Sequence, residues 1–138
     1  MRRVAHIFAL VVLVVGALSP ARAEEPWRVP ASARARRNPL PSSAAAAGLT
    51  LFAAYCVQCH GAAGRGDGLA AAALNPRPRD LTSPSVQGEF DGALFFKITR
   101  GRGAMPAWLW LSERERWALV WAIRNLGSAS THSERCSK

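Results

Sequence analysis

The stretch Cys56-Val57-Gln58-Cys59-His60, CVQCH, decides the fold of this chain. It places one thiol on each side of a dipeptide and an imidazole directly after the second thiol. Four kinds of site use such a pattern: a structural zinc site, a redox dithiol, an attachment site for covalent haem, and two buried cysteines beside an unrelated histidine. The rest of the sequence discriminates between these four.

Zinc and redox chemistry are both disfavoured by what surrounds the motif. A structural zinc ion needs four ligands, and beyond the motif the chain after residue 23 offers only Cys136 and His132, both in the polar segment SASTHSERCSK. A thioredoxin-like dithiol needs a strand before its two cysteines, whereas the residues before Cys56 predict a helix. The alternative of two structural cysteines leaves the adjacent histidine unexplained.

Covalent haem uses every specified residue of the motif. Two thiols at this spacing add to the two vinyl groups on one edge of the porphyrin, and the adjacent His60 becomes an axial iron ligand. A second ligand must come from a loop that reaches the opposite haem face, and the candidates are Met105, His132 and Lys97. Met105 is favoured because it lies in GRGAMPAW, where glycines allow a tight fold and Pro106 stiffens the exit.

The N-terminus has the pattern of a secretory signal. A charged MRRVAH is followed by an apolar run from Ile7 to Leu18 and by the small-residue site Ala21-x-Ala23. We expect cleavage after Ala23 and export to the periplasm of a Gram-negative cell. A retained membrane anchor is the alternative, but the apolar run is short for a bilayer span of about 20 residues.

The charge of the chain suits a protein partner better than nucleic acid. The formal charge of +9 falls to +6 when the predicted signal is removed, since it contains three arginines and no acid, and residues 44–127 carry only +3. The chain has no cluster of basic and aromatic residues of the kind that binds nucleic acid. A mildly basic surface favours redox protein partners, a donor and an acceptor, with acidic docking surfaces.

The composition divides the chain into four expected segments. The stretch after the signal holds four prolines and four arginines, which predicts an extended arm that buries no core. The last residues are polar and contain Cys136, which is a free thiol, an intermolecular crosslink or a residue without a role. Apart from such a crosslink, the protein is expected to be a monomer. The expected boundaries are a signal peptide at 1–23, an arm at 24–43, a single domain at 44–127 and a polar tail at 128–138.

The domain is predicted to be all-α, with about three main helices and long loops. Ser42 and Ser43 precede an alanine-rich helix that ends near the cysteines. A second helix spans residues 90–100, with Asp91 as its N-cap and Gly101 after its end. A third opens at the capping box of Ser112 and Glu115 and runs to Leu126, with Gly127 as its stop. About 85 loop-rich residues bury little apolar surface, which favours a prosthetic group at their centre.

Over residues 44–127 the chain resembles the class I c-type cytochromes. The matching segments occur in the order GLTLFAAYC, CVQCHG, GAAGRGDG, NPRPRDLT, ALFFKITRGRGAMPAW and WALVWAIRNL. The resemblance implies a small cytochrome c fold around one haem c, held through thioethers at Cys56 and Cys59. It implies His60 and Met105 as the axial iron ligands.

The resemblance also implies contacts that hold the site in place. The first and last helices are expected to cross, which would set Gly48 and Phe52 against Trp121. The carbonyl of Pro76 or Pro78 is expected to accept the ring N–H of His60. Trp108 and Trp110 are expected to cover the methionine side of the haem or to lie at a docking edge, with burial the default for tryptophan.

The expected function is one-electron transfer without catalysis. An iron held by both histidine and methionine has no open position for a substrate, and the thioether sulfur raises the reduction potential. The main hypothesis is a periplasmic carrier between a respiratory or dehydrogenase donor and an oxidase or reductase. One alternative is a dedicated cytochrome subunit of a larger redox complex, in peripheral contact with a membrane. Another is a haem enzyme or gas sensor with a labile Met105.

Overall fold

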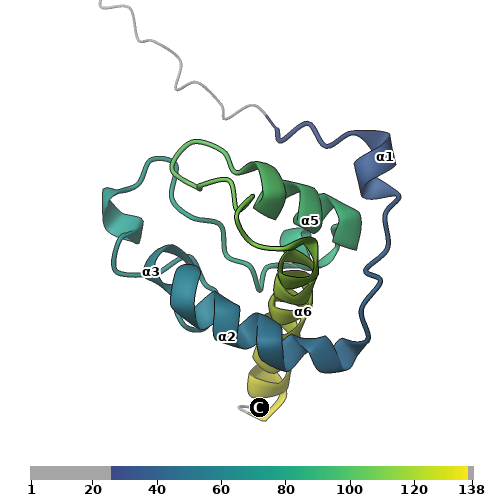
Figure 1. Cartoon of the computed structure of the whole chain (residues 1–138). Coiled ribbons are helices and arrows are strands. Elements are labelled where there is room, and N and C mark those ends of the chain that lie inside the picture. The colour runs from purple at the N-terminus through teal and green to yellow at the C-terminus, as the bar shows by residue number, and fades with distance from the viewer. Residues whose placement is uncertain (1–25, 137–138) are drawn as a thin grey trace, which may run out of the picture.

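The computed structural model describes residues 26–136, with side chains through residue 129 (Figure 1). The predicted signal at 1–23 and the side chain of Cys136 therefore lie outside the described residues. In chain order the elements are α1 (Ala31–Arg34), η1 (Ser42–Ala44), α2 (Ala45–Tyr55), α3 (Val57–His60), η2 (Ala71–Ala73), α4 (Pro84–Gln87), α5 (Asp91–Arg100) and α6 (Glu113–Cys136).

Three helices, α2, α5 and α6, frame the described part of the chain, as predicted. Helix α2 crosses α6, and α5 also packs against α6 (Figure 1). Within residues 26–136 the extended pairing is limited to one isolated bridge between Arg102 and Met105. The prediction of an all-α fold with three main helices and long loops is confirmed.

The crossing of α2 and α6 depends on Gly48. A Cβ atom at this position would lie 1.9 Å from the carbonyl oxygen of Ala118, so the two backbones touch where the side chain is missing. The resemblance implied that Gly48 and Phe52 lie against Trp121, whereas the nearest part of α6 to Gly48 is the backbone of Ala118. Trp121 donates its indole N–H to the carbonyl of Leu40 at 2.9 Å.

We expect Gly48→Ala to destabilise the protein. The added methyl group cannot fit against backbone atoms of α6, so the helices must separate, and overpacking of this kind lowers the free energy of unfolding by about 1–3 kcal/mol. Thermal and urea unfolding of the haem-loaded protein measure the effect. Gly88→Ala is the matched control, because its new Cβ would lie 3.1 Å from the nearest atom; equal stability of the two variants would contradict a close helix crossing.

The core is built around an aromatic pair that joins α5 to α6. Trp117 is buried and stacks on Phe95 with ring centroids 4.1 Å apart. Val120 and Ala122 have no exposed surface, and Phe52 brings α2 into the same cluster. The predicted apolar face of the last helix thus packs on both other helices.

The predicted start of α6 is confirmed, whereas the cap predicted for α5 is wrong. The capping box is confirmed: Ser112 N donates to the Glu115 carboxylate at 2.7 Å, and Glu115 N donates to Ser112 Oγ at 3.2 Å. Asp91 is the first residue of α5 instead of its N-cap, which is Phe90. Its carboxylate accepts two bonds from Arg124, at 2.9 and 2.7 Å, and so serves α6 rather than its own helix.

The serines before α2 do not cap it. Ser42 begins the short helix η1, which runs directly into α2, and no side chain bonds to the first turn of either element. Pro41, at the N-cap position of η1, sets the direction of the chain there. The predicted start of the helix is right within a few residues, but the predicted capping by a serine side chain is wrong.

Gly127 does not end the last helix, contrary to prediction. Helix α6 continues through it to Cys136. A Cβ at Gly127 would lie 2.3 Å from the side chain of Gln87, which donates to the carbonyls of Leu81 at 2.7 Å and Ile123 at 3.0 Å. The glycine therefore makes room for a side chain that ties α4 to α6, and its backbone stays helical.

The arm before residue 44 is ordered against the helices, where the sequence predicted an extended segment. We call residues 26–41 the strap. Its helix α1 lies over the start of α5, Arg36 pairs with Glu113, and Asn38 donates to the carbonyl of Trp117 at 3.0 Å. The proline and arginine content that predicted an open chain is compatible with this path because the guanidinium of Arg36 lies over the rings of Phe95 and Trp117. The domain boundary at residue 44 stays a prediction.

Among the described helices, none combines the length and the hydropathy that crossing a bilayer requires.

Candidate functional site

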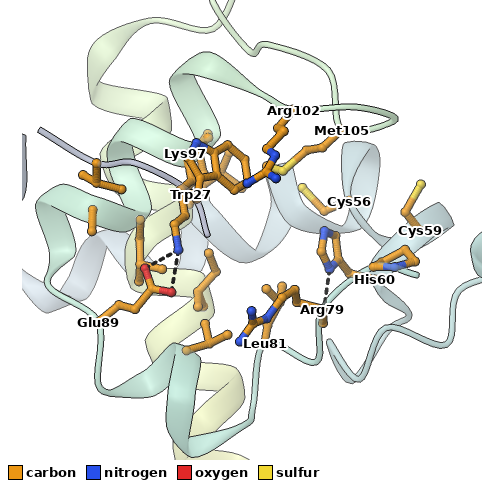
Figure 2. A pocket seen from close by; sticks show the side chains of 18 of the residues that line it. Trp27, Cys56, Cys59, His60, Arg79, Leu81, Glu89, Lys97, Arg102 and Met105 are labelled. Carbon is orange, nitrogen blue, oxygen red and sulfur yellow. Dashed lines mark hydrogen bonds and ion pairs between the residues drawn. The ribbon is translucent and has the colours of Figure 1, made fainter. Parts of the chain in front are cut away.

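The CVQCH motif forms one helical turn at the end of α2. Cys56 N donates to the carbonyl of Phe52 at 2.9 Å, which closes α2, and His60 N donates to the carbonyl of Cys56 at 2.8 Å, which forms the turn of α3. Residues four apart on a helix share a face, so Cys56 and His60 point the same way. Both line one cavity together with Cys59 (Figure 2).

The cavity is large for a domain of this size and mostly apolar. Its volume is about 820 Å³, near the upper end of the range for small-molecule sites. Its walls come from α2, α5, α6 and the loop 74–81, and Met105 faces it from the loop after α5. The apolar lining residues include Phe52, Leu81, Val86, Leu94, Ile98, Leu119 and Ile123.

The ring of His60 is held by a backbone carbonyl of the loop 74–81. Its Nδ1 lies 3.1 Å from the carbonyl oxygen of Arg79, and because a carbonyl only accepts, Nδ1 carries the proton (Figure 2). The other ring nitrogen, Nε2, is then an unprotonated donor atom suited to a metal. Burial lowers the pKa of His60, although the bond to Arg79 opposes this, so the neutral ring is favoured.

The carbonyl that accepts this bond belongs to neither predicted residue. The sequence proposed Pro76 or Pro78, and the structure places Arg79 there. The physical reason is the loop's anchoring: the Pro78 carbonyl lies where a Cβ of Gly66 would be, 2.3 Å away, and Leu81 N donates to Gly64 O at 2.7 Å. These contacts turn the next carbonyl, that of Arg79, toward the histidine.

The glycine-rich loop after the motif folds back on it. Gly66 N donates to the carbonyl of His60 at 2.8 Å, and Gly68 N to that of Cys59 at 3.1 Å. Gly66 has φ +75°, and a Cβ at Gly68 would lie 2.4 Å from the carbonyl of Gln58, so neither position accepts a side chain readily. The loop therefore satisfies the free carbonyls at the end of the motif and fixes its orientation.

Cys56 does not have the character of an activated redox thiol. Burial, with the neighbouring Cys59, raises the pKa of the Cys56 thiol to about 12. Reactive and metal-bound cysteines have pKa values lowered below the ordinary value of about 8.5. Within the described residues, no group of three or more His, Cys, Asp and Glu side chains gathers as a metal site would require.

The loop that carries Met105 is folded as tightly as the sequence predicted. Arg102 N donates to the carbonyl of Met105 at 2.8 Å, and Met105 N donates back to the carbonyl of Arg102 at 3.0 Å. Gly101 has φ +59°, and a Cβ there would lie 2.4 Å from the carbonyl carbon of Pro106. Met105 packs on the core and lines the same cavity as His60.

The other two ligand candidates are placed differently. Lys97 also lines the cavity, but its ammonium is bound by both carboxylate oxygens of Glu89. The side chain of His132 lies outside the described residues. Of the residues predicted to hold a cofactor, the structure thus brings Cys56, Cys59, His60 and Met105 to one cavity.

The two tryptophans after Met105 fasten its loop to the motif. The ring of Tyr55, directly before Cys56, meets Trp108 at 5.5 Å and Trp110 at 5.0 Å between centroids. Trp108 is half-buried, whereas Trp110 is 63% exposed, so the default expectation of burial is wrong for Trp110. Neither ring lines the cavity.

Sequence reasoning missed the contribution of the strap. Pro26, Trp27, Val29 and Arg34 line the cavity, although the arm was expected to lie outside the domain. A large aromatic residue in an otherwise polar, proline-rich segment was the available signal, because exposed tryptophan is unusual without a partner.

The charges around the cavity match an anionic occupant. Five cationic side chains and one carboxylate line it, so the lining carries a formal +4 apart from His60; they are Arg34, Arg77, Arg79, Lys97, Arg102 and Glu89. An apolar cavity with two thiols, a buried imidazole and a thioether at one end and cations around it fits haem, an apolar macrocycle with two carboxylates.

A small all-α domain in which a C-x-x-C-H turn and a methionine loop face one cavity defines a class I cytochrome c. Residues 43–121, more than half of the chain, match the family described as cytochrome C oxidase, cbb3-type, subunit III. The chain belongs to this family. Its cofactor is accordingly covalent haem c, and the domain is an electron-carrier domain.

A solved structure supports the fold over part of its length. The chain is similar to a chain of the Kuenenia stuttgartiensis reducing HAO-like protein complex, with 28% sequence identity and a TM-score of 0.54. The match covers 64% of this chain and 46% of that one, so the chain spans less than half the length of this relative. A comparison with curated proteins gives no significant match.

Proposed function

We propose that this protein is an exported one-electron carrier in which Cys56 and Cys59 hold haem c through thioethers and His60 and Met105 ligate its iron. One observation carries the proposal: these four side chains, separated by up to 49 positions in the sequence, line a single apolar cavity. When bound, haem c supplies a reversible Fe(III)/Fe(II) couple.

The residues around the iron ligands suit electron transfer rather than catalysis. The carbonyl of Arg79 fixes the tautomer and the direction of His60, and the tight loop at 101–106 fixes Met105. With both axial positions taken by protein groups, no coordination site remains for a substrate, and a thioether ligand favours the reduced iron. A ring and a loop that are held at the backbone move little when the iron changes charge, which keeps the reorganisation energy low.

The proposed partners are a redox protein that donates electrons and one that accepts them. The formal charge of +6 on the chain without residues 1–23 favours partners with acidic docking surfaces. The predicted signal supports a periplasmic location, as does the family, whose cytochrome c domains work outside the cytoplasm.

A dedicated subunit of a larger redox enzyme is the second candidate. The family is described as a subunit of an oxidase, and the similar solved chain belongs to a multi-protein complex. In this case the protein would serve one enzyme in peripheral contact with the membrane. Cys136 and the basic residues of the strap are candidate attachment points.

Visible spectra and potentiometry of the mature protein test the electron-carrier function. We expect a low-spin haem that cannot be extracted by acidified organic solvent, a reversible one-electron couple, and no binding of carbon monoxide by the reduced protein at neutral pH. A high-spin haem that binds carbon monoxide readily would refute the closed coordination and favour a gas sensor or enzyme.

Purification from native cells distinguishes the free carrier from the subunit. A carrier should elute alone at high salt under reducing conditions, whereas a subunit should remain with its enzyme. Repeating the purification without reductant, on the wild type and on Cys136→Ser, shows whether a disulfide makes the attachment, and a complex that survives only in the wild type identifies that crosslink.

A further inference from the structure

The haem cavity has a second side, opposite Cys56, Cys59 and His60, where Met105 and Arg102 lie beside Trp27 (Figure 2). Figure 2 shows Cys56, Cys59 and His60 on one side of the cavity and Trp27, Lys97 and Glu89 on the other. The lining on that side, which we call the far end, includes Trp27 of the strap and the charged Lys97 and Glu89, and most of the remaining lining is apolar.

The chemistry of haem c determines which of its groups meets this far end. The vinyl groups that react with cysteines lie on one edge of the porphyrin, and the two propionates lie on the opposite edge. Attachment at Cys56 and Cys59 therefore directs two carboxylates away from the motif, toward the side of the cavity where Lys97 and Glu89 are found.

Trp27 joins the cations of this end. Its ring lies 5.6 Å from Lys97 Nζ and 5.7 Å from Arg102 Cζ, each measured to the ring centroid. A cation over an indole face within about 6 Å is attracted by the ring, more strongly where water is excluded. Lys97 comes from α5, Arg102 from the methionine loop and Trp27 from the strap, so three separate segments converge at this point.

We propose that the far end is a binding site for the two propionates of haem c, in which Lys97 and Arg102 bind the carboxylates and Trp27 covers them from solvent. The charges of Lys97, Arg102 and Arg34 together with that of Glu89, all of which line the cavity, sum to +2, which matches the two carboxylates. Since Lys97 Nζ has three N–H donors, it can contact a propionate while it keeps its bond to Glu89.

The strap that carries Trp27 is fixed at points remote from the cavity. A Cβ at Gly92 would lie 2.0 Å from the carbonyl of Ala33, so α1 rests directly on the backbone of α5. Further along, Leu40 accepts a bond from Trp121 at 2.9 Å. Gly92 itself does not line the cavity, so a substitution there displaces α1 and the strap without removing a lining side chain.

Removal of either cation should lower the reduction potential. Uncompensated propionates stabilise ferric iron, because oxidation adds a positive charge near two negative ones. We expect Lys97→Gln and Arg102→Gln each to lower the ratio of reduced to oxidised haem at a fixed ambient potential on the order of tenfold. Arg114→Gln, an exposed cation outside the cavity, is the matched control and should change the ratio much less.

Removal of the cover should shift the potential in the same direction. Water and salt that reach the propionate edge stabilise the charged ferric haem, so Trp27→Ala should lower the potential and make it more dependent on ionic strength. Trp27→Phe, which keeps an aromatic face, should stay close to the wild type. Gly92→Ala should reproduce the effect of Trp27→Ala. Phe96→Ala serves as the aromatic control, because Phe96 is a half-buried aromatic residue that does not line the cavity.

Redox titrations of the mature holoproteins at low and high salt decide the proposal. It is overturned if Lys97→Gln and Arg102→Gln behave like Arg114→Gln, or if Trp27→Ala and Gly92→Ala behave like Phe96→Ala. Loss of the holoprotein in Trp27→Ala but not in Phe96→Ala would support the cover, with Trp27→Phe then giving the potential. The proposal depends on the haem cofactor alone, so it holds equally for a free carrier and for a subunit.

Discussion

The double variant Cys56→Ser, Cys59→Ser should fail to form a cooperatively folded domain when it is produced without haem. The reason lies in the cavity of about 820 Å³ that the four predicted haem-binding residues share with the apolar core. At about 24 cal/mol for each Å³ of empty core, even a quarter of this volume costs about 5 kcal/mol. That loss equals the whole stability of many small domains, which is about 5–15 kcal/mol.

The core that remains without haem is too small to offset such a loss. The buried cluster around Trp117 and Phe95 joins α5 to α6, but Leu94, Ile98 and Ile123 also face the cavity. These side chains would be exposed to water on one side. We therefore expect weak helical structure without fixed tertiary packing in the double variant.

Circular dichroism in the far and near ultraviolet, with thermal unfolding, measures this outcome. Cys136→Ser is the control, because it removes a cysteine outside the motif and should leave haem attachment and unfolding unchanged. A sharp thermal transition and a native near-ultraviolet spectrum in the haem-free double variant would show that the polypeptide packs its own core.

The parts of the site set by local rules were predictable from the sequence. CVQCH needs only one helical turn to bring Cys56 and His60 to the same face, and the capping box of Ser112 and Glu115 forms within four residues. The tight loop at Met105 follows from glycine and proline chemistry. In each case the residues that determine the conformation are neighbours in the chain.

The parts set by distant contacts were not predictable. Gly127 has the sequence of a helix stop, yet its neighbour in space is Gln87, forty positions away, and the helix continues. Asp91 has the sequence of a cap, yet Arg124 binds it. The carbonyl that orients His60 belongs to Arg79 because Gly64 and Gly66 anchor the intervening loop.

The strap is the clearest case of a conformation that depends on distant contacts. Its composition predicted a segment that buries no core, and composition contains no information about the surface that a segment meets. The missing side chain of Gly92 and the rings of Phe95 and Trp117 make that surface, and all three lie more than fifty residues downstream of Arg36. Trp27 lines the cavity, and α1, a few residues further along the strap, rests on the backbone of α5.

Replacing Met105 should open the iron to external ligands and lower the reduction potential. Met105→Leu fills a similar volume without a ligand sulfur, so the fold should tolerate it at a cost below about 1.5 kcal/mol. The reduced variant should bind carbon monoxide, and its potential should fall on the order of 0.1 V, within the ~0.8 V range that axial ligands control. Visible spectra with and without carbon monoxide, and redox titration, measure both effects.

Met105→His separates ligation from packing. An imidazole in this loop should restore six-coordinate iron and exclude carbon monoxide, yet keep a low potential, because it lacks the preference of sulfur for reduced iron. If Met105→Leu instead keeps the wild-type potential and spectrum, Met105 fills space and another group is the ligand. If the wild type itself binds carbon monoxide as fast as Met105→Leu, the coordination is open and a gas sensor is favoured. Closed coordination in the wild type, lost in Met105→Leu and regained in Met105→His, is the result that a dedicated electron carrier requires.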